Sequence, residues 1–172
     1  MTERAIVPSL QEKVMEAIER VEHLISRVPA DRIGWRAPMP ANVTQANDLG
    51  HTLGHLLDCM AGFCAVFRKA FPEEFGDFDK LREMPLNGSW SPEEASKGLR
   101  MIAGYIARGF KRCSDADLAR MVPTVFVAEG ESLLTLLLGN LEHLNNHKYQ
   151  LFLYLKLAGV AVGSRDVYRF RE

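Results

Sequence analysis

The stretch GNLEHLNNHKYQLFLYLKLAG, residues 139–159, is the most leucine-rich part of the chain and places two histidines four positions apart. Apolar residues occupy most sides of this segment, which predicts a central helix from about residue 131 to 158 with Gly159 as its C-terminal cap. Four residues advance an α-helix by slightly more than one turn, so His143 and His147 would project from one face. Two imidazoles so placed can bind one metal ion, or they can be core histidines with hydrogen-bond partners.

Three further segments have apolar residues at steps of three or four, the pattern of an amphipathic helix. Each begins with a residue that can cap the free backbone N–H groups of a first turn. The sequence SPEE, residues 91–94, contains a serine cap, a proline at the first helical position and a glutamate that completes a capping box. Ser9 and Glu12 form the same pattern, and Asn47 or Asp48 caps the remaining helix. The predicted helices cover residues 9–28, about 48–70 and 92 to about 110.

Four long helices with few strand signals predict an all-α four-helix bundle with long connections between the helices. The length of 172 residues fits a single domain, residues 1–172. The connections 71–90 and 112–130 are long for a compact domain, and we expect them to form walls of a cavity. The sequence leaves open the order in which the helices pack.

Composition excludes several classes of function. The chain has 21 basic and 22 acidic side chains without a long block of either sign, so we expect no nucleic-acid binding. The longest apolar runs, such as 133–138, are far shorter than a membrane span, and the N-terminus does not resemble a signal peptide. Three cysteines without CxxC spacing are typical of reduced thiols in a cytoplasmic protein.

The remaining histidines supply a second pair at helical spacing. His51 and His55 are also four residues apart, on the predicted helix 48–70. Helical bundles build metal sites from inward side chains on facing helices, so two such pairs strengthen the metal hypothesis. His23 is isolated, and we interpret it as a structural histidine near the end of its helix.

Short motifs in both helices resemble the DinB/YfiT-like metalloenzyme superfamily. NDLGHTLGHLLDCMAGF, residues 47–63, resembles the start of the second helix in that family, and the Asp-Leu-Gly lead places His55, not His51, on a metal ligand. HLNNHKYQLFLYLKLAGV, residues 143–160, resembles a later family segment in which His143 and His147 match the other two ligands. VPADRIGWRAP, residues 28–38, is similar to the stretch that follows the first helix. The chain departs from the pattern at three positions, Asn146, Lys148 and Tyr149, none of which is an expected ligand.

The resemblance implies a three-histidine site that holds zinc or nickel, with one coordination position open. A metal of this kind lowers the pKa of a bound water or thiol. Some relatives are S-transferases that use low-molecular-weight thiols, and others are thiol-dependent isomerases. The resemblance therefore implies a small-molecule substrate, such as a low-molecular-weight thiol, and a homodimer.

Other side chains near these ligands have two interpretations each. His51, Asp58 and Gln150 are candidates to support the ligands or contact substrate, and the simpler interpretation is that His51 and Asp58 lie at the edge of the bundle. Cys59 follows His55 by one turn, so it is either a sulfur ligand or a small buried hydrophobe. No catalytic acid or base is identified.

Three functions follow from these observations. The first is a divalent-metal-dependent enzyme, either a low-molecular-weight-thiol S-transferase or a related hydrolase. The second is a non-catalytic helical bundle that binds a small ligand. The third is a helical interaction module whose histidines belong to the core.

Overall fold

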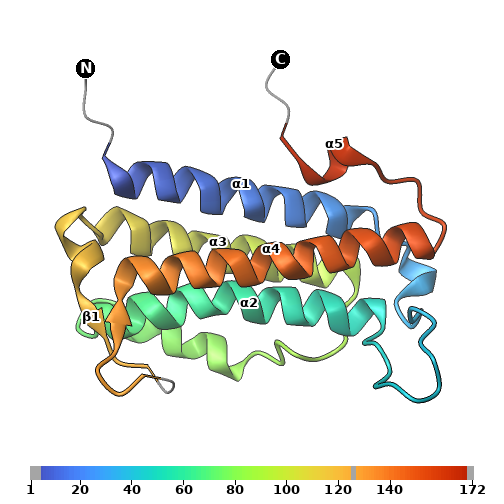
Figure 1. Cartoon of the computed structure of the whole chain (residues 1–172), viewed down its shortest axis with the longest axis horizontal. Coiled ribbons are helices and arrows are strands. Elements are labelled where there is room, and N and C mark those ends of the chain that lie inside the picture. Colours follow the sequence, from blue (N-terminus) through green and yellow to red (C-terminus); the bar gives the residue numbers. More distant parts are fainter. Residues whose placement is uncertain (1–4, 125–126, 170–172) are drawn as a thin grey trace.

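A computed structural model of the chain describes residues 5–124 and 127–169, most of which lie in four long helices (Figure 1). Short helical turns, a two-stranded hairpin and a small C-terminal helix connect or cover them. The long helices are α1 (Ile6–Ser26), α2 (Leu49–Ala70), α3 (Pro92–Arg112) and α4 (Leu133–Leu157). The short elements are η1 (Ala30–Arg32), η2 (Gly76–Glu83), η3 (Ala116–Ala119), β1 (Met121–Val122), β2 (Glu131–Ser132) and α5 (Ser164–Val167).

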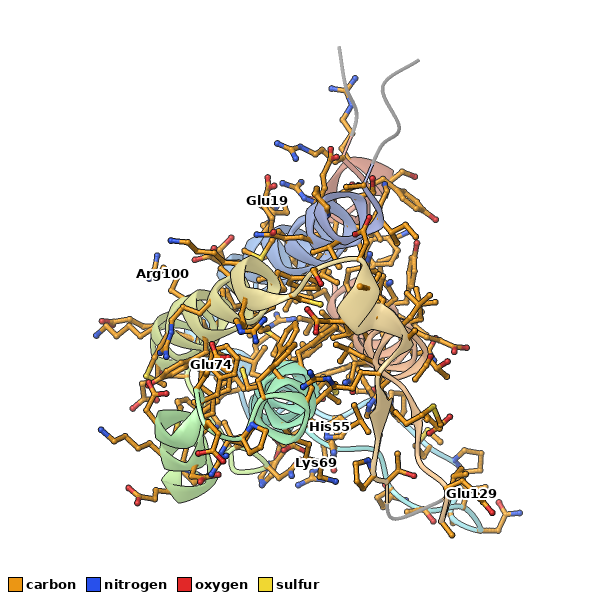
Figure 2. All side chains as sticks on the ribbon, turned by 90° about the vertical axis from the view of Figure 1, so that its left-hand side faces the viewer. Glu19, His55, Lys69, Glu74, Arg100 and Glu129 are labelled. Carbon is orange, nitrogen blue, oxygen red and sulfur yellow. The ribbon has the colours of Figure 1, made fainter. Side chains whose placement is uncertain are left out.

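The four helices form the expected bundle. α2 packs against α3 and α4, and α1 packs against the same two helices from the other side. α1 and α2 are therefore diagonal in the bundle, as are α3 and α4, which is visible when the molecule is viewed along the bundle (Figure 2). The connections from α1 to α2 and from α3 to α4 join diagonal helices and need their length. The connection 71–91 joins neighbouring helices, so it is longer than the packing of the helices requires.

Local capping explains where three of the helices begin. The side chain of Asp48 accepts a hydrogen bond from the backbone N–H of His51, and Ser91 forms the predicted capping box with Glu94. Ser132 caps α4, and its side chain accepts a hydrogen bond from the backbone N–H of Thr135. Residues 131–132 pair with β1 as a strand, so the helix cannot start before them. α4 consequently begins two residues later than the sequence predicted.

The predicted start of α1 at Ser9 is wrong. The helix begins at Ile6, with Ala5 at its N-cap position, and Ser9 lies within the first two turns. The carboxylate of Asp115 accepts hydrogen bonds from the backbone N–H groups of Ile6 and Val7, at 2.9 and 2.8 Å. A distant side chain thus performs the capping that Ser9 was expected to provide.

The expectation that α4 is the central helix is also wrong, because α2 is more deeply buried. Thirteen of the 22 residues of α2 are buried, compared with seven of the 25 in α4. Leu138, Leu153 and Leu157 of α4 are 47–55% exposed. A leucine-rich helix can therefore lie at the side of a bundle, with its additional leucines on the outer face.

Among the described helices, none has the length and apolarity required to cross a membrane.

Candidate metal centre

Four side chains with metal-binding atoms converge where α2 and α4 face each other. His55 and Cys59 come from α2, and His143 and His147 come from α4. Their candidate ligand atoms all lie within 4.8 Å of one another. His55 Nε2 is 3.0 Å from His147 Nε2, and Cys59 Sγ is 3.8 Å from His143 Nε2. The structure therefore brings together the three histidines predicted from the sequence and adds the sulfur of Cys59.

An asparagine in the connection between α2 and α3 orients His55. The amide nitrogen of Asn87 donates to Asp58 Oδ2 at 3.0 Å, so its amide oxygen faces the histidine. His55 Nδ1 lies 3.0 Å from that oxygen and must donate its proton to it. Nε2 of His55 is then left with a free lone pair, the state in which imidazole binds a metal.

A second amide orients His147 in the same way. His147 Nδ1 is 2.7 Å from Gln150 Oε1, and the amide nitrogen of Gln150 donates to the hydroxyl of Tyr154 at 3.0 Å. His147 Nδ1 therefore also acts as a donor, and its Nε2 carries a lone pair. Burial lowers the pKa of His147, and although the hydrogen bond to Gln150 raises it, the neighbouring His55 and His143 lower it further. The ring is consequently biased toward its neutral, metal-binding form.

The orientation of the two rings places the lone pairs of two nitrogen atoms close together. Because both Nδ1 atoms donate to amide oxygens, both Nε2 atoms direct lone pairs toward each other across 3.0 Å. Two lone pairs at this distance repel unless a proton or a metal cation lies between them. The residues present therefore fit a bound cation.

Close backbone packing holds Asn87 beside His55. Gly54 immediately precedes His55, and a Cβ atom on it would lie 2.1 Å from the carbonyl oxygen of Gly88 and 2.4 Å from that of Leu86. One turn earlier, the carbonyl of Gly50 accepts a hydrogen bond from the backbone N–H of Trp90. Glycine at both positions lets the 86–90 segment rest directly on α2.

A cavity of about 720 Å³ opens beside the cluster, a volume suited to a small molecule. His143 and Cys59 form part of its wall, and His55 bonds Asn87, which also lines it. Figure 2 shows His55 on α2, on the side of the bundle away from α1. The 71–90 connection supplies much of the remaining wall, as the sequence predicted. Its lining residues are Phe78, Asp79, Leu81, Met84, Pro85, Leu86, Asn87 and Gly88. The 112–130 connection, within the part that the structure describes, lines none of this cavity, so that expectation is wrong.

The other candidate residues have separate positions. Gln150 bonds the candidate ligand His147 directly, whereas Asp58 is linked to His55 through Asn87. His51 Nδ1 is 2.7 Å from the carboxylate of Asp48 at the start of α2, and His51 is not part of the ligand cluster. His23 pairs with Asp166 of α5 at 2.7 Å, which is the structural role expected for it.

Asn87 is the site residue that the sequence analysis missed. It lies in the 21-residue connection 71–91, whose path cannot be read from periodicity, and its partner His55 is 32 positions away. The only local signal is its position before Gly88, a dipeptide typical of turns.

Comparison with solved structures identifies the architecture. A DinB-like protein from Bacillus cereus has a TM-score of 0.69 at 15% identity, and the match covers 93% of this chain and 97% of that protein. A DinB-like protein from Bacillus subtilis has a TM-score of 0.66 at 13% identity, covering 94% and 99% respectively. The fold is DinB-like. No family model and no curated protein matches the sequence.

The DinB-like fold confirms the architecture implied by the sequence motifs. In this chain the faces that carry His55, His143 and His147 belong to α2 and α4, which are neighbours in space although α3 separates them in sequence.

Proposed function

We propose that His55, His143 and His147 bind a divalent metal ion and that the chain is a metal-dependent enzyme acting on a small molecule held in the adjacent cavity. The observation that carries this proposal is the approach of two imidazole Nε2 atoms to 3.0 Å while both Nδ1 atoms donate elsewhere. Three imidazole ligands suit zinc or nickel better than magnesium or calcium, which prefer oxygen.

The chain's own residues would prepare this site. Asn87 and Gln150 hold two ligand rings in the required tautomer, so little rearrangement is needed on binding. Asp58 accepts a hydrogen bond from the amide nitrogen of Asn87, so its role would be to position Asn87 beside His55. Apolar side chains such as Phe78, Leu81 and Leu86 line the cavity and would exclude water from a bound substrate.

The reaction class that fits best is transfer to a low-molecular-weight thiol, with metal-dependent hydrolysis as the related possibility. A bound divalent ion would supply a Lewis acid that lowers the pKa of a thiol or water. The DinB-like fold and the sequence resemblance support this class. The three cysteines are free and buried, in agreement with a reduced, cytoplasmic setting.

Metal content tests the first half of the proposal. The protein is purified without a nickel column after growth with added zinc and nickel, and bound metal is measured by mass spectrometry. We expect close to one ion per chain, and a loss of most of it in His143→Ala and His147→Ala. His51→Gln is the matched control, because His51 lies on the same helix as His55 but bonds Asp48, and it should retain metal. Equal, near-zero metal in every sample would reject the proposal.

Thiol consumption tests the second half. The metal-loaded protein is incubated with a panel of low-molecular-weight thiols and electrophiles, and loss of free thiol is followed with and without a chelator. We expect consumption that depends on the metal. Metal binding combined with ligand binding but without turnover would instead support the alternative function, a non-catalytic small-ligand-binding bundle.

A further inference from the structure

The sulfur of Cys59 is placed where a fourth ligand would be. Cys59 follows His55 by one turn of α2, and its Sγ is 3.8 Å from His143 Nε2. In a tetrahedral zinc site with bonds of about 2.0–2.3 Å, neighbouring ligand atoms are separated by roughly 3.3–3.7 Å. Two of the separations, 3.0 Å and 3.8 Å, lie within a few tenths of an ångström of that range, and all four candidate ligand atoms lie within 4.8 Å of one another.

The surroundings of Cys59 differ from those of an ordinary buried cysteine. Cys64 also lies on α2, is buried and lines the same cavity, but it is not part of the ligand cluster. Cys59 is also buried, at 4% exposure, but its sulfur lies 3.8 Å from the Nε2 atom of His143. A small hydrophobe needs no such neighbours, whereas a metal ligand does.

We propose that Cys59 is the fourth ligand of the ion held by His55, His143 and His147. This inference rests on the proposed metal site. On binding, the S–H bond of Cys59 breaks, a bond from sulfur to the ion forms, and the proton passes to solvent. No electron is transferred, so no oxidant or reductant is required.

A ligand set of three nitrogens and one sulfur has two consequences. Sulfur favours zinc and similar ions over the oxygen-preferring ions magnesium, calcium and manganese. With Cys59, the residues that would hold the ion would supply all four ligands of a tetrahedral zinc site. A substrate would then have to share the ion with Cys59 or displace it, and Cys59 lines the cavity beside the cluster.

Cobalt substitution tests this assignment independently of activity. The metal-free protein is loaded with Co²⁺, and bound cobalt and the near-ultraviolet absorption are recorded. We expect a thiolate-to-cobalt charge-transfer band in the wild type and its loss in Cys59→Ser and Cys59→Ala. Cys64→Ser, a buried thiol on the same helix and cavity wall, should retain the band.

The outcomes separate the two proposals. Cobalt binding without the band, or an unchanged band in both Cys59 variants, would overturn the role of Cys59 and leave the three-histidine site intact. Failure of the wild type to bind cobalt would overturn the metal site itself. A competition titration gives a second measurement, in which Cys59→Ser should weaken zinc binding by about tenfold or more. Circular dichroism establishes that each variant is folded.

Discussion

At the scale of single residues, hydrogen bonds from residues that would not bind the metal themselves set the tautomer and orientation of His55 and His147. The Asn87 amide oxygen accepts a hydrogen bond from His55 Nδ1, and the Asn87 amide nitrogen donates to Asp58. Removing this amide would leave the His55 ring free to rotate and to change tautomer. We predict that Asn87→Ala lowers zinc affinity by about 10–100-fold, the usual cost of losing such a partner. A competition titration with a chromophoric chelator measures it.

Asn140→Ala is the control for that measurement. Asn140 lines the same cavity and lies against Gly62, and its side chain makes no hydrogen bond to the candidate ligands that the structure describes, unlike Asn87 and Gln150. We expect its zinc affinity to stay close to that of the wild type. Equal affinity in Asn87→Ala and the wild type would show that the amide does not position His55.

At the scale of elements, the glycines of α2 set how closely the cavity wall approaches. A Cβ atom at Gly54 would lie within 2.4 Å of two carbonyl oxygens, so the 86–90 segment would have to move. We predict that Gly54→Ala destabilises the fold by roughly 1–3 kcal/mol, the typical cost of overpacking, and weakens metal binding by displacing Asn87. Urea unfolding and the same zinc titration measure the two effects.

Gly104→Ala provides the matched control on α3. A Cβ atom there meets no neighbouring atom within 4 Å, so the substitution should keep or raise stability, because alanine favours a helix interior by about 1 kcal/mol over glycine. If Gly54→Ala were as stable as Gly104→Ala, the 86–90 segment would be able to move away from α2 without lowering the free energy of unfolding.

The elements also show which features can be predicted from sequence. The start at Ser91 was predicted correctly, and Asp48 was one of the two predicted caps of α2, because in both cases the cap and the capped N–H group are within four positions. The start of α1 was not, because its cap, Asp115, is more than 100 residues away. The histidine spacing predicted which rings share a helical face. It did not show that α2 faces α4, and it gave no sign that Asn87 reaches His55.

At the scale of the whole molecule, the proposed ligands join distant parts of the chain. His55 and His147 are 92 residues apart, so the complete ligand set exists only in the folded protein. A ligand that binds only the folded state stabilises it by about 2.7 kcal/mol at 100 times its dissociation constant. For a chain of this size, 1 kcal/mol raises the melting temperature by about 2–4 °C. We therefore predict a rise of roughly 5–10 °C when zinc is added at that concentration to the metal-free protein.

Calorimetry with and without zinc measures this shift, and the double variant His143→Ala/His147→Ala controls for binding elsewhere. The variant keeps His55 and Cys59 on α2 but lacks both proposed ligands from α4, so zinc can no longer join the two helices. Its melting temperature should be almost independent of zinc. An equal rise in both proteins would place the stabilising ion outside the α2–α4 interface, since only binding there requires the two helices to be packed together.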